Sequence, residues 1–105
     1  MSPVERLRKA LSALPDVEQL PSRFGARRNA AWFVQGREFA HLHSEELLDL
    51  RLPRSIQAGL RSDPKARFRK SPSAWLEFEF HTVDDVARLI ELAGNAWAAA
   101  RESAK

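Results

Sequence analysis

The residues with the clearest chemical potential lie in the stretch REFAHLH, Arg37 to His43. His41 and His43 are two of only three histidines, and they stand two residues apart in a predicted strand. Side chains alternate between the two faces of a strand, so both imidazoles project to one side, about 7 Å apart along the strand. Such a pair suits metal binding, acid–base chemistry near neutral pH, or an ordinary polar surface.

Metal binding by the two histidines would need at least one more ligand. A neighbouring strand could add a carboxylate such as Asp49 or Glu77, but the sequence determines no third ligand. We therefore assign no metal and no cofactor at this stage. The absence of cysteine excludes disulfides, thiolate metal sites and cysteine nucleophiles.

The composition indicates one folded domain over residues 1–105. Hydrophobic residues make up 44% and charged residues 30%, and two domains would leave each half with too little core. The apolar runs are much shorter than the roughly 20 residues of a membrane-spanning helix, and the N-terminus is amphipathic. We expect a cytoplasmic protein with no membrane partner. The oligomeric state is not indicated.

The charge distribution is uneven and suggests a second kind of partner. Residues 21–70 carry a net charge of +6, whereas residues 71–105 carry −3. Within the basic part, Lys65, Arg67 and Arg69 lie on one side of an extended run. They could bind an anion together with Arg23 to Arg28, as in a module for nucleic acid or an acidic protein, or they could protect an edge strand from aggregation.

Capping residues and prolines predict three helices. Ser2 begins a first helix that Pro15 ends, Pro53 opens a short middle helix, and Thr82 begins a long helix that we expect to reach about Arg101. The apolar face expected for the long helix consists of Val83, Val86, Ala87, Ile90, Ala93 and Trp97.

Alternating apolar residues predict the strands. Two strands flank the turn Gln35-Gly36, a third follows in LLDLRLP, a ragged edge strand is expected in KARFRK, and AWLEFEF forms the last. Residues 15–28 contain two prolines and a glycine, so we expect an irregular connection there. The predicted fold is α+β, with one antiparallel sheet of four or five strands and all three helices packed on one face.

The face opposite the helices collects the candidate site. If Ala40 and Leu42 face the core, alternation sends polar and aromatic residues of three strands to the other, open face. These residues are Phe39, His41, His43, Asp49, Arg51, Trp75, Glu77 and Glu79. Aromatic walls with a few convergent polar groups are typical of small-molecule sites, although a simply solvated face would carry similar residues.

We predict binding, with conversion left open, of a small planar aromatic or anionic molecule on this open face. His41 or His43 would be the titratable group, because histidine changes charge near neutral pH. Arg51 would meet an anionic substituent, Trp75 and Phe39 would stack on the ring, and Glu77 would line the site. Glu38 or Asp49 would orient an imidazole.

The motif E-F-A-H-x-H, followed by LDLRLP and by Trp75 at the start of a later strand, resembles the luciferase domain of fungal bioluminescence. It is still more similar to short bacterial proteins with this domain and no established function. The resemblance covers about residues 24–97. It implies a domain that in fungi oxidises a hydroxylated pyrone with molecular oxygen, and it implies that Glu38, His41, His43 and Trp75 match family positions.

Overall fold

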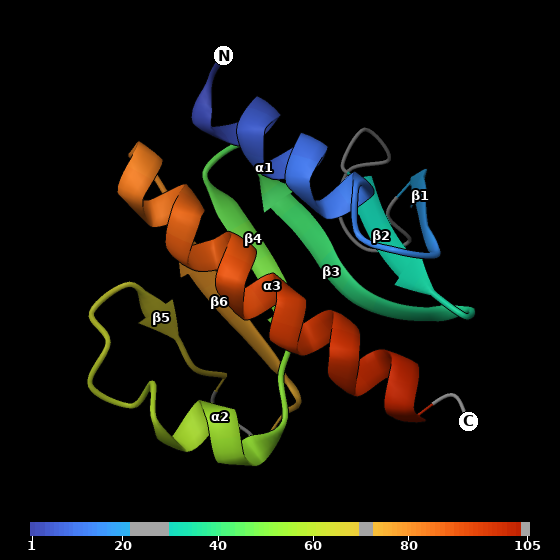
Figure 1. Cartoon of the computed structure of the whole chain (residues 1–105). Coiled ribbons are helices and arrows are strands. Elements are labelled where there is room, and N and C mark those ends of the chain that lie inside the picture. Colours follow the sequence, from blue (N-terminus) through green and yellow to red (C-terminus); the bar gives the residue numbers. More distant parts are fainter. Residues whose placement is uncertain (22–29, 70–72, 104–105) are drawn as a thin grey trace.

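Six strands form one antiparallel sheet in the computed structural model, which describes residues 1–21, 30–69 and 73–103 (Figure 1). The strand order is β1-β2-β3-β4-β6-β5. The elements are α1 (Pro3–Ser12), β1 (Val17–Pro21), β2 (Ala30–Val34), β3 (Arg37–Ser44), β4 (Leu47–Arg51), α2 (Arg54–Ala58), β5 (Ala66–Arg67), β6 (Trp75–Glu79) and α3 (Val83–Ser103). The predicted α+β class is confirmed, with six strands in place of four or five.

The additional strand is β1, which lies in the segment that was expected to be irregular. It pairs with β2, from Val17 opposite Val34 to Pro21 opposite Ala30. Four of its five residues are exposed, so no apolar alternation marks it, and Pro21 is tolerated because β1 is an edge strand. The prediction of an irregular connection was therefore wrong for residues 17–21, while residues 22–28 lie outside the described part.

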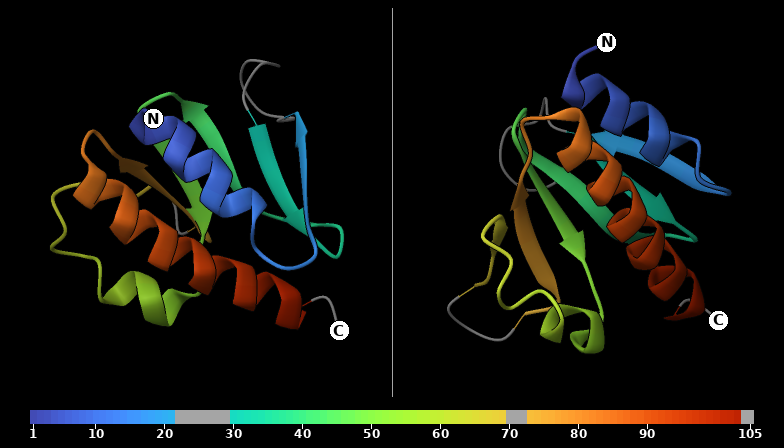
Figure 2. Two further views of the ribbon diagram at one scale, coloured as in Figure 1. Left: turned by 45° about the horizontal axis from the view of Figure 1, so that its top comes forward. Right: turned by 60° about the vertical axis from the view of Figure 1, so that its left-hand side comes forward.

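Helices α1 and α3 cover one face of the sheet and pack beside each other (Figure 2). Ser2 caps α1 in a capping box: its side chain accepts a hydrogen bond from the Glu5 amide, and its own amide donates to the Glu5 side chain. Ser12, the last residue of α1, accepts a hydrogen bond from Trp32 Nε1 at 3.0 Å. Trp32 is fully buried in the core and therefore lies on the face of the sheet that the helices cover.

A two-residue turn joins β2 and β3 into a hairpin. Gln35 and Gly36 adopt φ values of 51° and 78°, both positive as in a type I′ turn. The connection after β4 also follows from its proline. Pro53 precedes the short helix α2, whose Gln57 donates hydrogen bonds to the carbonyl oxygens of Leu52 and Ser73 and so ties α2 to the ends of β4 and β6.

The core lies between the sheet and the two long helices. The predicted apolar strand residues Leu48, Leu50, Leu76 and Phe78 are all buried in it. The predicted apolar face of α3 was partly wrong, since Val83, Ala87 and Ile90 are exposed. The buried residues of α3 are instead Val86, Leu89, Leu92, Ala93, Ala96 and Ala100. Small alanines at this contact allow the helix to lie close to the sheet.

None of the described helices combines the length and apolar character needed to cross a membrane.

Candidate functional site

The strand register brings three predicted site residues into one row across the open face. His41 of β3 lies opposite Asp49 of β4, and Asp49 lies opposite Glu77 of β6. Two residues further along the strands, Arg51 lies opposite Trp75. Directly opposed residues in an antiparallel pair share a face, with Cβ atoms about 5 Å apart. We call His41, His43, Asp49, Trp75 and Glu77 the histidine patch.

His41 and Asp49 form the closest contact of the patch. His41 Nε2 lies 2.7 Å from Asp49 Oδ2, and Nδ1 of the same ring lies 3.7 Å from Glu38 Oε1. His41 is only 6% exposed and Asp49 only 1%. The centre of the open face is therefore dry, which excludes the interpretation of these two residues as solvated surface groups.

Trp75 lies beside His41, as expected for a wall of the site. The two ring centroids are 4.8 Å apart with an angle of 49° between the ring planes. Trp75 is half-buried. Its indole therefore offers a flat apolar surface next to the imidazole, in the tilted arrangement that aromatic pairs often adopt.

His43 occupies a different position from His41, although both belong to one strand. It lies at a bulge, because Leu42 pairs with Leu48 and Ser44 pairs with Leu47, so that His43 is the extra residue of β3 at this point. Its side chain is 59% exposed, and its Nδ1 lies 3.9 Å from Asp49 Oδ2 and 3.6 Å from Glu77 Oε2. Asp49 thus faces both histidines.

A second bulge overturns the prediction for Phe39. Trp32 pairs with Ala40 whereas Phe33 pairs with Glu38, so Phe39 is an extra residue in β3. Phe39 is fully buried in the hydrophobic core with Ala40, and alternation resumes only beyond the bulge. Phe39 was expected to stack on a ligand at the open face, and the structure places it in the core instead.

Phe33 takes the place on the open face that Phe39 was expected to fill. It lies opposite Glu38, and its neighbour on the same face, Ala31, lies opposite His41. Both residues are buried. Phe33 was not among the predicted site residues. Alternation in AAWFV places it on the face of the sheet that Trp32 does not occupy, but the sequence did not show that Trp32 lies in the core.

The remaining predicted residues lie towards the edges of the patch. Arg51 is exposed and, with Arg37, borders a cavity of about 190 Å³ near the end of α3. Lys65 contacts Asp85 at 2.5 Å, and Arg67 contacts both Glu77 and Glu79. Two of the three residues of the alternative anion site, Lys65, Arg67 and Arg69, are thus already paired with carboxylates. Residues Arg23 to Arg28 lie outside the described part.

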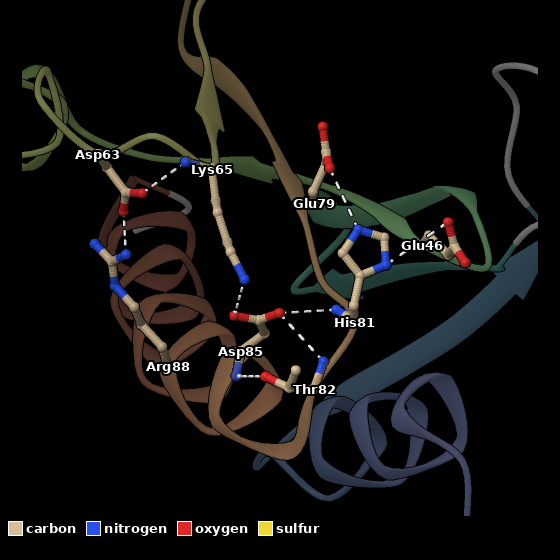
Figure 3. A network of polar contacts seen from close by, with 8 residues as sticks. All are labelled: Glu46, Asp63, Lys65, Glu79, His81, Thr82, Asp85 and Arg88. Carbon is tan, nitrogen blue, oxygen red and sulfur yellow. Dashed lines mark hydrogen bonds and ion pairs between the residues drawn. The ribbon is translucent and has the colours of Figure 1, made fainter.

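The third histidine, His81, belongs to a polar network at the start of α3 (Figure 3). Its backbone amide and that of Thr82 donate to Asp85 Oδ2, while Asp85 Oδ1 accepts from Lys65. The Lys65 hydrogen bond, followed by that from the His81 amide, lowers the pKa of Asp85 well below its ordinary value. This network holds the loop before β5 against the helix, and Arg67, which contacts both Glu79 and Glu77, links it to the edge of the histidine patch.

The fold and the patch define the class of protein: an α+β domain with a buried histidine–carboxylate pair on the open face of an antiparallel sheet. Residues 36–96 match the family model of the Luciferase domain. The chain therefore belongs to the Luciferase domain family. The matched segment runs from the turn before β3 into α3 and contains the whole histidine patch. No curated protein and no solved structure matches the chain.

Proposed function

We propose that the open face of the sheet binds a small planar molecule, aromatic or anionic, and that His41 exchanges a proton with it. The observation that supports this proposal is the 2.7 Å contact between His41 Nε2 and Asp49 Oδ2, with both side chains withdrawn from solvent. A dry histidine–carboxylate pair beside an aromatic ring is a common way to build a site for proton transfer.

The cost of the buried pair supports a role beyond stability. Removing charged groups from water costs several kcal/mol per ion, and replacing a buried pair by apolar side chains is often neutral or stabilising. His41 and Asp49 lie on the opposite side of the sheet from the core that α1 and α3 cover. Ionisable groups placed at such expense outside the main core are frequent at functional sites.

We also propose a direction for the proton transfer. The Asp49 carboxylate lies 2.7 Å from Nε2 and so favours the ring proton on that nitrogen, by the same logic that an aspartate serves in a catalytic triad. The proposed exchange with a ligand is at Nδ1, the nitrogen that faces Glu38, and it requires the ligand to displace the groups that cover this buried atom. Trp75 and Phe33 supply flat apolar surface for the ligand ring.

Such proton removal fits the reaction class that the family resemblance implies. A hydroxyl on an aromatic or pyrone ring becomes an electron-rich oxyanion when it loses its proton, and that anion reacts more readily with oxygen. We propose oxidative conversion by molecular oxygen as the second stage, after binding and proton transfer. Oxygen uptake with a hydroxypyrone, followed with an oxygen electrode, tests this stage separately from binding.

Calorimetric titration with para-hydroxybenzoate tests the binding stage. The titration is made in the presence of a chelator, with cyclohexanecarboxylate as a non-planar anion of similar size. We expect binding of the planar probe, with at least a tenfold loss of affinity in His41→Ala, equivalent to about 1.4 kcal/mol. His81→Ala is the matched control, because His81 also faces two carboxylates but lies outside the patch.

Equal affinity of wild type and His41→Ala for para-hydroxybenzoate would refute the proposal, as would equal binding of the non-planar anion. A steep fall of affinity with salt concentration, shared by both anions, would indicate the basic segment as the binding surface.

A further inference from the structure

We propose that His43, Asp49 and Glu77 bind a divalent transition-metal ion such as Zn²⁺. One potential ligand atom from each of these three side chains lies within 4.8 Å of the other two. This is the one group of three or more histidine and acidic side chains with such geometry in the described ranges. The inference goes beyond the proposed function, because all three ligands are protein atoms and no organic molecule is needed.

The distances suit the bond lengths of a tetrahedral metal ion. Bonds of about 2.0–2.1 Å from zinc to nitrogen and oxygen place neighbouring ligand atoms roughly 3.3 Å apart. His43 Nδ1 lies 3.6 Å from Glu77 Oε2 and 3.9 Å from Asp49 Oδ2. His43 is exposed and Glu77 is half-buried, so small side-chain rotations can draw the three atoms together.

A second, independent observation comes from Asp49 itself. Asp49 is 1% exposed, and its Oδ1 is buried without a hydrogen-bond partner in the part of the chain that the structure describes. A carboxylate oxygen without a partner is costly to bury, because it loses its water and gains nothing in return. A divalent cation bound through Oδ2, the oxygen that lies 3.9 Å from His43 Nδ1, would offset the buried negative charge of this carboxylate.

Neighbouring groups hold two of the three ligands in place. His41 Nε2 contacts Asp49 Oδ2 from the protein side, and Arg67 lies 3.5 Å from Glu77 Oε1, leaving Oε2 directed to His43. Partners of this kind orient the side chains that bind a metal directly, and their loss typically lowers metal affinity about 10–100-fold. His41 and Arg67 therefore act as positioning residues for the ion.

The ligand types select the class of metal. One imidazole nitrogen and two carboxylate oxygens suit Zn²⁺, Co²⁺ and related ions, whereas Mg²⁺ and Ca²⁺ favour sites made of oxygen alone. Three protein ligands leave a fourth tetrahedral position, as in zinc sites that bind water or a substrate. That position would lie between the exposed His43 and Glu77 and face solvent.

Calorimetric titration of chelator-treated protein with Zn²⁺ tests the site, using chain without a polyhistidine tag and no organic probe. We expect one ion per chain, with binding lost in His43→Ala and weakened in Glu77→Gln. In His41→Ala we expect a loss of roughly 10–100-fold, as for other residues that orient ligands. His81→Ala is the control and keeps the wild-type affinity, and Mg²⁺ gives no heat.

Titration with Co²⁺ gives a second measurement. Attraction of the ion to nearby carboxylates without direct binding would not produce its signal. Inner-sphere tetrahedral Co²⁺ absorbs strongly in the visible range, and this band is absent in His43→Ala if the site is as proposed. Circular dichroism is the check that the variant is folded, which we expect because the His43 side chain is largely exposed.

Unchanged Zn²⁺ affinity in His43→Ala, loss of affinity in His81→Ala, or no binding to the wild type would each overturn the inference. The two proposals fail separately. Zinc binding is measured without the planar probe, and binding of para-hydroxybenzoate is measured in the presence of chelator.

Discussion

Replacing His41 and Asp49 by leucine, singly and together, would show whether their contact exists for stability or for function. The contact joins Nε2 and Oδ2 at 2.7 Å between side chains that are 7% and 2% exposed. Because both groups are buried, removal of one leaves the other without its closest partner in a dry environment. The two single variants and the double variant form a double-mutant cycle.

The magnitudes follow from burial. His41→Leu leaves the Asp49 carboxylate buried, and breaking a buried pair in this way costs about 3–5 kcal/mol. Asp49→Leu leaves an imidazole that can be neutral, so we expect a smaller loss of about 1–3 kcal/mol. In the double variant no buried ionisable group of the pair remains, and its stability should return to within about 1 kcal/mol of the wild type. The coupling free energy is then at least about 3 kcal/mol.

Urea unfolding followed by tryptophan fluorescence measures these differences. With a slope of about 1–3 kcal/mol per molar urea, a loss of 4 kcal/mol lowers the midpoint by roughly 1 M or more. The exposed pair His81 and Glu79, 3.3 Å apart, serves as the control, and its coupling should not exceed about 1 kcal/mol. Additive losses in the double variant of His41 and Asp49 would refute the argument that the pair is costly to the fold.

Two further perturbations test other parts of the structure. Phe39→Ala should lower the free energy of unfolding by about 3–5 kcal/mol, because Phe39 is a core residue. The affinity for para-hydroxybenzoate should not change. A small change in the urea midpoint together with loss of probe binding would contradict this prediction. Since the pKa of Asp85 is lowered from 3.8 in the folded protein, its ionised form stabilises the fold above that value, and this contribution disappears as pH falls below about 4. Asp85→Asn should therefore be less stable than wild type at pH 7, with the difference shrinking between pH 4 and pH 2 in urea titrations; a constant difference would contradict the linkage.

Local signals were sufficient for most elements. AWLEFEF has strict alternation over a strand that is apolar on one face, and it became β6 with Leu76 and Phe78 in the core. Ser2 and Thr82 are caps whose hydrogen bonds lie within a few residues, so short-range chemistry alone determines where α1 and α3 begin. Such features depend on neighbours in the sequence and are visible there.

Features that depend on distant partners were missed. Strand β1 has little apolar pattern because it lies at the edge and is largely exposed, and it forms by pairing with β2. The buried side of α3 is set by its contacts with the sheet and α1, so Ile90 is exposed although it fits an apolar stripe. Strict alternation failed for Phe39 because a bulge inserts one residue into β3.

For the candidate site, the sequence by itself determined the face. Alternation places His41, His43, Asp49, Trp75 and Glu77 on one side of their strands, because successive side chains of a strand point in opposite directions. Only the tertiary structure decided which of these residues meet. The register of β3, β4 and β6 is a property of three separate segments, and it set His41 against Asp49 and Asp49 against Glu77. Burial of the first pair likewise depends on packing, which turned two polar residues into a dry, closely spaced pair.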